Sequence, residues 1–171
     1  MSNPIISELE TNTHLFFLRG VFSNFASTTQ LEYDGIKFNS TEQAFMYAKA
    51  KLFNDTTSMI AIVREKRPAQ AKQLGRGVQG FDPVIWDKHK YQLMLDVNLC
   101  KYTQFENYRN YLINTGDKIL VEANGKPDLI WSCGLYANDP RITDNSKWPG
   151  ENLLGKVLME IRSMLKDHKH E

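Results

Sequence analysis

The sequence predicts an α+β fold class, mostly helical with a small β component, and three observations lead to it. Six segments carry the apolar periodicity or the capping residues of helices, whereas only short stretches resemble strands. Asp34-Gly35 supplies the turn of a short hairpin near the N-terminus. The 171 residues, 42% of them hydrophobic, suffice for one sizeable core. We therefore expect a single compact multihelical domain over residues 1-171 with a short N-terminal hairpin.

The β component is expected in three places. Residues 15–18 form a short buried strand that ends at Arg19-Gly20, and residues 31–38 form the hairpin. Residues 118–123 alternate like a strand that presents Glu122 near its end. The helices are expected over 41–53, 56–65, 68–74, 84–101, 105–113 and a last segment carrying Leu154 to Leu165, before a frayed tail at 166–171.

Local signals set the ends of the middle helices. Asp55 can cap the second helix, and Asp82-Pro83 is the usual start of a long one. Pro68 opens the third helix, which Gly75-Arg76-Gly77 is expected to terminate. These caps make three consecutive helices the predicted middle of the chain.

Composition narrows the functional classes. The net charge of +1 and the pI of about 7.8 exclude a global basic field, so any nucleic-acid contact is local. Cys100 and Cys133 form no paired framework, which indicates a reducing compartment with free thiols. The four histidines show no metal-ligand spacing, so we expect no metal and no cofactor. No apolar run approaches the ~18 residues of a membrane span, and a cytoplasmic protein is expected.

The first helix, Thr41 to Phe53, carries two charges on its apolar side. At 100° per residue Glu42 and Lys49 fall on the same side as the large apolar residues, while Lys51 points the opposite way. A buried ion must be paired or change its pKa, so two inward charges suggest a site whose ends lie about 10 Å apart. In the alternative, Glu42 only complements the helix dipole and Lys49 extends its head into water.

Other residues have both a functional and a structural interpretation. Asn24 and Phe25 suit a loop that binds a sugar or base, or a turn with a core plug. Gly75 and Arg76 suit a phosphate or carboxylate site, or a helix end followed by a surface arginine. Trp86 is either core or the wall of a base pocket. The loop 136–149 is long enough for a lid or for a mobile segment, and the helix start at 150–155 offers amide donors to an anion.

Seven short motifs occur in an order and spacing that resemble those of one known family. They run from about residue 14 to residue 165 and are Ser23-Asn24-Phe25, Glu42-Gln43 with Lys49, Leu74-Gly75-Arg76, Phe81-Asp82 with Trp86, Leu120-Val121-Glu122, Asp128 with Trp131 and Gly134, and Asn152-Leu153-Leu154-Gly155 followed by Leu158-Met159-Glu160-Ile161-Arg162. No motif is specific by itself, but their order is. On these motifs the sequence is identified as a member of the NADAR superfamily.

The resemblance implies a mostly helical domain that acts as an N-glycosidase, a hydrolase of the bond between ribose C1 and a nitrogen. The substrates that it implies are ADP-ribose on guanine, as nucleotide or in DNA or RNA, and ribosylamino-pyrimidine phosphates of the riboflavin pathway. A nucleotide-binding sensor without turnover and a partner-binding helical domain are the alternatives from other classes. Many relatives have glycine where this chain has Ser132, and a side chain there can narrow or re-aim the pocket.

Roles for individual residues follow from this chemistry. Cleavage develops positive charge on the sugar and requires a proton for the departing nitrogen, so carboxylates are needed. We assign Glu42 to acid/base work and Asp128 to the sugar hydroxyls or the water, while Glu122 orients Lys49. The resemblance makes Lys49 a candidate for an imine with ribose C1. The remaining substrate-binding candidates are Asn24, Arg76, Trp86, Trp131 and Asn152, with Phe25, Gln43, Gly75, Gly134 and Gly155.

Overall fold

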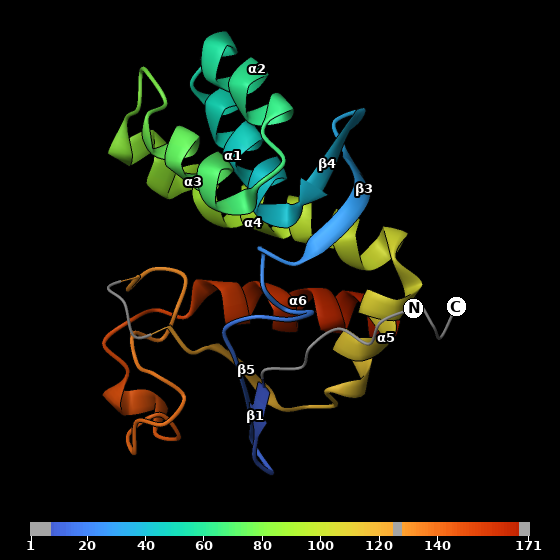
Figure 1. Ribbon diagram of the computed structural model, residues 1–171. Coiled ribbons are helices and arrows are strands. Elements are labelled where there is room, and N and C mark those ends of the chain that lie inside the picture. Colours follow the sequence, from blue (N-terminus) through green and yellow to red (C-terminus); the bar gives the residue numbers. More distant parts are fainter. Residues whose placement is uncertain (1–7, 125–127, 168–171) are drawn as a thin grey trace. The chain divides into compact units, whose positions relative to one another are not determined.

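A computed structural model of the chain describes residues 8–124 and 128–167 (Figure 1). The chain divides into two compact units, Asn24–Phe105 and a second that joins Met1–Ser23 to Glu106–Glu171. In the described part of the chain, six α-helices and two small sheets confirm the α+β class with a mainly helical content. One domain over residues 1-171 stays a prediction.

The Asn24–Phe105 unit begins with the predicted hairpin. Strand β3 (Ser27–Tyr33) pairs antiparallel with β4 (Ile36–Ser40). Asp34 and Gly35 have φ angles of 55° and 72°, the left-handed values that a tight hairpin turn requires. Leu31 and Phe38 face each other across the strands and are fully buried. The hairpin is confirmed, and it is longer than predicted because β3 starts four residues earlier.

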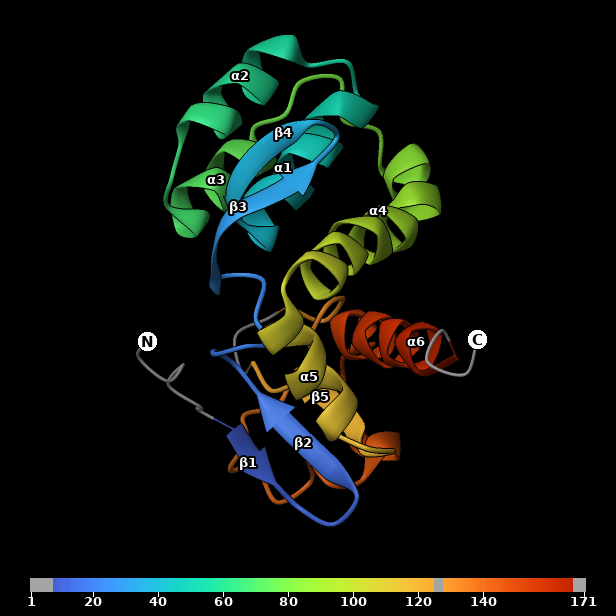
Figure 2. The same ribbon diagram turned by 90° about the vertical axis from the view of Figure 1, so that its right-hand side faces the viewer.

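Four helices follow, and they are α1 (Thr41–Leu52), α2 (Thr56–Arg64), α3 (Pro68–Arg76) and α4 (Pro83–Gln104). The predicted caps Asp55 and Asp82 accept hydrogen bonds from the first turns of α2 and α4. Within this unit α1 packs against α2, α3, α4 and the hairpin (Figure 2). It is therefore the central element of the unit.

Helix α1 is buried on more than the apolar side that its periodicity predicts. Every residue from Thr41 to Ala48 is buried, and Ala50 is buried as well. Periodicity detects the side with large apolar residues, but it does not detect a helix that neighbours cover on several sides. Lys51 is exposed, as predicted, and its Nζ lies 2.6 Å from Asp34 Oδ2.

The second unit is built on a three-stranded sheet in the order β1-β2-β5. Strand β2 (His14–Phe17) pairs antiparallel with β1 (Glu8–Glu10) and parallel with β5 (Ile119–Glu122). Strand β1 was not predicted, because three residues carry too little pattern. Helix α6 (Leu153–Asp167) packs on β5, and α5 (Glu106–Asn114) packs on α6. Lys166 and Asp167 are helical, so the predicted tail starts too early, and its residues 168–171 lie outside the described residues.

The loop over residues 136–149 is anchored to the sheet. It contains a short 3-10 helix, η1 (Asn145–Lys147), and a buried Ile142 in the same cluster as Phe16 and Val121. His14 Nε2 lies 2.9 Å from Asn145 Oδ1. Trp148 donates its indole N–H to the Ile142 carbonyl at 2.7 Å. The loop was interpreted either as a free lid or as a fully mobile segment. These contacts fit neither interpretation.

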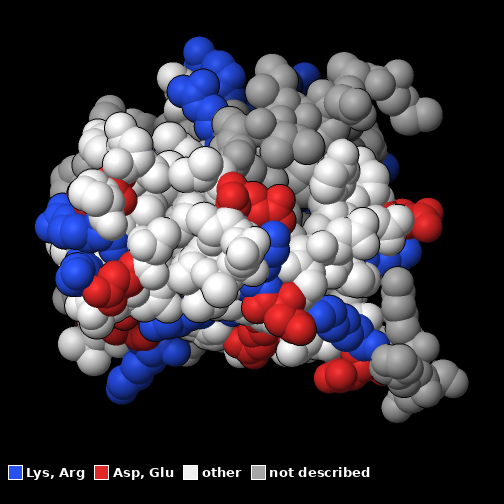
Figure 3. All heavy atoms as spheres, turned by 90° about the horizontal axis from the view of Figure 1, so that it is seen from below, with Lys and Arg blue, Asp and Glu red and all other residues white. Residues whose placement is uncertain are grey.

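Two features are absent from the described residues. In residues 8–124 and 128–167 no helix is both long and apolar enough to cross a membrane. Across the same residues no three His, Cys, Asp or Glu side chains gather as metal ligands. On the face seen in Figure 3, basic and acidic side chains are mixed, without a broad patch of one sign.

Candidate functional site

The first turn of α1 presents Glu42. Ser40 caps the helix by accepting a hydrogen bond from the Gln43 N–H at 3.1 Å. The Glu42 N–H donates to the Asn24 carbonyl at 2.9 Å, and the residue is only 4% exposed. Its Oε1 lies 4.0 Å from Lys72 Nζ of α3. The predicted inward position of this carboxylate is confirmed, and a cation lies next to it.

Lys49 lies near the end of α1 and is half-buried. Its Nζ donates a hydrogen bond to the Gly75 carbonyl at 2.8 Å. The same atom lies 4.5 Å from the Phe81 ring centroid and 5.3 Å from that of Trp86. Burial lowers the pKa of this amine, because the charged form loses water. The arrangement gives the lysine a larger fraction of neutral, nucleophilic amine than a surface lysine has.

Helix α3 brings a carbonyl to this amine by unusually close packing. The predicted end of the helix at Leu74 is wrong, since α3 continues to Arg76 with Gly77 as its C-cap. A Cβ atom on Gly75 would lie 2.0 Å from Met46 Sδ. Gly75 is therefore needed for contact between α3 and α1. Its role toward Lys49 is to accept a hydrogen bond through its carbonyl, and this role does not depend on the flexibility of glycine. The signal for a helix end was overridden by packing between helices.

Two residues near this cluster were missed by the sequence reasoning. Lys72 lies three residues before Gly75 and so on the same face of α3, with its Nζ 5.7 Å from the Phe25 ring centroid. Phe81 is 44% exposed although it contacts Lys49 and packs its ring on Trp86 at 6.5 Å. The spacing of Lys72 from Gly75 was the only available signal. Phe25 itself is 43% exposed, so it is not a core plug.

Two other predicted substrate residues are engaged inside this unit. Asn24 is buried, and its Oδ1 accepts a hydrogen bond from Asn98 Nδ2 at 3.2 Å. Gln43 is buried, accepts from the Asn39 N–H, and donates to the Ile62 carbonyl at the end of α2, both at 2.8 Å. Both side chains join elements of the fold. The Gln43 amide is thus occupied by backbone groups of the fold, and a contact of Gln43 with substrate stays a prediction.

Arg76 and Trp86 remain accessible to different degrees. Arg76 is exposed, and its only hydrogen bond within the described chain is a long one, 3.4 Å from Nη1 to Gln73 Oε1. Trp86 is half-buried between Phe45 and Phe81, with ring centroids 5.5 Å and 6.5 Å away. The Trp86 ring is thus part of the aromatic wall that Lys49 faces.

In the second unit, the segment 128–134 forms a tight internal network. Asp128 Oδ1 accepts hydrogen bonds from the N–H groups of Ile130 and Trp131, at 3.3 Å and 2.9 Å. Ser132 is fully buried, donates to the Asp128 carbonyl at 2.6 Å and accepts from the Gly134 N–H at 3.0 Å. The Ser132 hydroxyl thus joins parts of its own segment, and its effect in narrowing or re-aiming a substrate pocket stays a prediction. Asp128 likewise acts here as a turn former.

Asn152 joins the start of α6 to β5. Its Oδ1 accepts from the Glu122 N–H at 3.0 Å, and its Nδ2 donates to the Leu120 carbonyl at 2.9 Å. The Leu153 and Leu154 N–H groups donate to the carbonyls of Ile130 and Trp131, so the expected anion site at this helix start is not available. This position was predicted from sequence, but its use is structural.

The two predicted glycines of this unit are required by the backbone. Gly134 has a φ of 78°, and a Cβ there would lie 2.8 Å from both Leu129 Cδ2 and Pro149 Cγ. A Cβ on Gly155 would lie 2.1 Å from the Leu120 carbonyl oxygen. Trp131 and Glu122 are half-buried at the ends of this framework. Whether these residues contact substrate stays a prediction.

Comparisons with known proteins agree with the order of the motifs. The chain is 37% identical over 166 residues to N-glycosidase R617 of Acanthamoeba polyphaga mimivirus, covering 90% of this chain and 97% of that protein. It is 30% identical to the riboflavin biosynthesis protein PYRR, chloroplastic, of Zea mays, covering 94% of this chain but 26% of that protein. The NMR structure of the E. coli protein YbiA matches with a TM-score of 0.76 and 28% identity, covering 99% of this chain and 94% of that one.

The family model for the NADAR domain matches residues 14–166. This span contains the whole Asn24–Phe105 unit, and residues 14–23 and 106–166 of the other unit. The family model matches most of the chain, and the viral relative is similar along nearly its whole length. The chain therefore belongs to the NADAR domain family.

Proposed function

We propose that the chain removes ADP-ribose from guanine by hydrolysing the bond between ribose C1 and a guanine nitrogen. Relatives along most of the chain are named N-glycosidases, and hydrolysis of an N-glycosyl bond is the activity of this chain. The guanine-linked substrate is the part that we propose. It follows from the order of the motifs that this chain shares with the NADAR superfamily.

The observation that carries the mechanism is the environment of Lys49. A lysine becomes a nucleophile when its surroundings favour the neutral amine. Partial burial against Phe81 and Trp86 has that effect on Lys49, and the Gly75 carbonyl orients its Nζ. In the proposed reaction this nitrogen attacks ribose C1 as the bond to the base breaks. The sugar then opens to an imine, which water hydrolyses to release the ribose and regenerate the amine.

Glu42 is proposed to perform the proton transfers. Cleavage requires a proton on the departing nitrogen and stabilisation of positive charge on the sugar, and a buried carboxylate at the start of α1 is suited to both. Lys72 at 4.0 Å limits the cost of keeping this carboxylate in an apolar surrounding. Phe25, which lies beside Lys72, is proposed to cover the same part of the site.

A second substrate is supported by one comparison. The maize relative is named for riboflavin biosynthesis, and it shares 30% identity with nearly all of this chain. A ribosylamino-pyrimidine phosphate has the same C1–nitrogen bond, so the same lysine and carboxylate can act on it. The two substrates differ in the base and in the second phosphate, which are recognised away from C1.

The test is a comparison of two substrates with one covalent probe. The protein is incubated with an oligonucleotide carrying ADP-ribosylated guanine and, separately, with the riboflavin-pathway intermediates, and products are identified by mass. Borohydride is then added during turnover, because reduction of the imine leaves a sugar-phosphate mass on the peptide that contains Lys49. Lys51→Met is the matched control, since Lys51 lies on the same helix but is exposed. Release of guanine supports the proposal, whereas exclusive turnover of the riboflavin intermediates selects the second substrate.

A further inference from the structure

Helix α3 contacts both residues that carry the proposed chemistry. The Gly75 carbonyl accepts the hydrogen bond from Lys49 Nζ at 2.8 Å, and Lys72 Nζ lies 4.0 Å from Glu42 Oε1. Lys72 and Gly75 are three residues apart, so they lie on the same face of α3. Each of the two groups on α1 thus has a partner of opposite polarity on α3, a carbonyl for the amine and an ammonium for the carboxylate.

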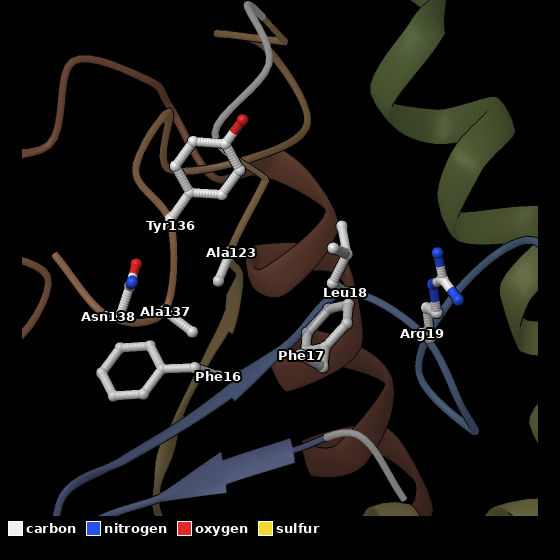
Figure 4. A pocket seen from close by; sticks show the side chains of 8 residues that line it. All are labelled: Phe16, Phe17, Leu18, Arg19, Ala123, Tyr136, Ala137 and Asn138. Carbon is white, nitrogen blue, oxygen red and sulfur yellow. The ribbon is translucent and has the colours of Figure 1, made fainter. Parts of the chain in front are cut away.

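A cavity in the second unit contains no such pair. It has a volume of about 500 Å³ and lies where β2 and β5 end (Figure 4). Its polar lining consists of Arg19, Tyr136 and Asn138, and none of the described residues that line it is an aspartate or a glutamate. The contacts between α3 and α1 are therefore the feature that bears on proton transfer.

The position of Lys72 is fixed by its surroundings. Its neighbour Ala71 is fully buried, and Gly75 packs so closely on Met46 that a Cβ would not fit between them. The Lys72 Nζ also lies 5.7 Å from the Phe25 ring centroid, within the range of a cation–π contact. A lysine on a loosely packed surface helix would lose side-chain entropy by holding one position. Here the packing of α3 and the aromatic ring hold the ammonium close to the carboxylate.

The Lys72–Glu42 pair differs from a surface ion pair of the same unit. The Lys51 and Asp34 side chains are 54% and 37% exposed, and a direct hydrogen bond of 2.6 Å joins them. The Lys72 side chain is 35% exposed, but that of Glu42 is only 5% exposed. A separation of 4.0 Å is too long for a hydrogen bond between Nζ and Oε1, so Lys72 acts on Glu42 through its charge. Water screens this charge less than it screens the exposed pair.

We propose that Lys72 is a positioning residue that stabilises the Glu42 carboxylate formed when Glu42 gives up its proton. The inference rests on the proposed function, in which Glu42 protonates the departing nitrogen. The charge of Lys72 stays constant, whereas negative charge develops on Glu42 as the bond to the base breaks. Their attraction is therefore stronger in the transition state than in the bound substrate, which is the condition for an effect on kcat.

The proton and electron movements of this step balance. The electron pair of the broken bond passes to the base nitrogen, which takes the Glu42 proton, while the Lys49 nitrogen forms the new bond to ribose C1. A proton of that nitrogen passes to the ring oxygen as the sugar opens to the imine. Water then adds its hydroxyl to C1 and returns its proton to Glu42. Throughout these steps Lys72 keeps its own protons and contacts no reacting atom.

The test is a double-mutant cycle on the full chain, with the variants Lys72→Met, Glu42→Gln and both together. It is run on whichever of the two candidate substrates the wild type cleaves, so it does not depend on the choice of base. Lys72→Met should lower kcat about tenfold and change KM by less than about twofold. In the Glu42→Gln background the same change should alter kcat by less than about twofold. Lys72→Arg keeps the charge and should restore most of the rate, and Lys51→Met is the matched control.

The outcomes separate this inference from the proposed function. A raised KM with an unchanged kcat, an equal loss in both backgrounds, or a Lys72→Arg variant as slow as Lys72→Met would overturn the role of Lys72. If Glu42→Gln is slow but Lys72→Met is not, the proposed function stands and this inference alone fails. If Glu42→Gln keeps the full rate, the acid/base role in the proposed function fails, and the role of Lys72 fails with it. Melting temperatures check that each variant is folded.

Discussion

Two regions of the Asn24–Phe105 unit bury a lysine, and the burial has a different consequence in each region. Lys49 near the end of α1 is half-buried, faces the partly exposed Phe81 and donates to a backbone carbonyl. Lys101 near the end of α4 is fully buried, with its Nζ 5.2 Å from the Tyr102 ring centroid. Burial lowers the pKa of both amines, and it lowers that of Lys101 further, to about 7. A lowered pKa alone therefore does not identify a nucleophile.

Access is what separates the two lysines. Around Lys49 the rings of Phe81 and Trp86 reach the surface, so a sugar can approach the amine. Helix α4 packs on β3, and Lys101 near the end of this helix is fully buried. The comparison predicts chemistry at the first lysine and a cost to stability at both.

Lys49→Met should reduce turnover by about 10³-fold or more, because it removes the nucleophile and keeps the aliphatic stem. The melting temperature should be unchanged or higher, since a partly desolvated charge is lost. Single-turnover kinetics and thermal unfolding give the two readouts. Near-normal turnover, together with the absence of a borohydride adduct, would remove Lys49 from the mechanism.

Glu42→Gln should slow turnover by about 10²-fold, since the amide keeps the volume but cannot transfer the proton. Stability should hold, because Lys72 is partly exposed and regains water when its partner is neutralised. A purely structural ion pair predicts the opposite pattern, with unfolding and activity lost together. Rates and denaturant midpoints measured on the same preparation distinguish the two.

Arg76→Ala should raise KM about tenfold and leave kcat nearly unchanged, because an exposed guanidinium that lacks a close partner in the described chain can bind a substrate phosphate. The loss should vanish for the corresponding substrate without phosphates. Arg67→Ala is a suitable control, since that guanidinium is paired with Glu65 at the opposite end of α3. An equal loss for both arginines, or for the unphosphorylated substrate, would contradict the assignment.

Lys101→Met should leave turnover unchanged and alter the pH dependence of stability. The unfolded lysine keeps a proton up to a pH of about 10.4, whereas the folded one releases it near pH 7, so wild-type stability rises with pH between these values. The variant should be more stable by the largest margin below pH 7, and the margin should shrink as the pH rises toward 10. Denaturant unfolding at several pH values measures this. A pH-independent margin would contradict it.

The sequence predicted what local signals determine. The Asp34-Gly35 turn, the Asp55 and Asp82 caps and the inward position of Glu42 are all confirmed. These features depend on residues within one or two turns of each other. The hairpin and the helices could be found for that reason.

Features that depend on distant residues were not predictable in the same way. A glycine-arginine-glycine run signals a helix end, but α3 continues for two residues into the run, and a Cβ on the first glycine, Gly75, would collide with Met46. The complete burial of Lys101 and the internal use of Asn152 also depend on neighbours far along the chain. No period or spacing contains that information. The order of the family's motifs supplied the candidate residues, and the contacts show which of them the fold already uses.

The anchored loop has a consequence for how a ligand meets the second unit. Tyr136 and Asn138 stand on a short span between Leu135 and Ile142, and both of these are held in the cluster around Phe16. His14 ties the chain again at Asn145. A ligand in the cavity lined by Tyr136 and Asn138 therefore finds its wall already in place, and it orders few additional residues, each of which would cost about 1–2 kcal/mol. Association there should be set by diffusion and desolvation, not by a slow closing motion of the chain.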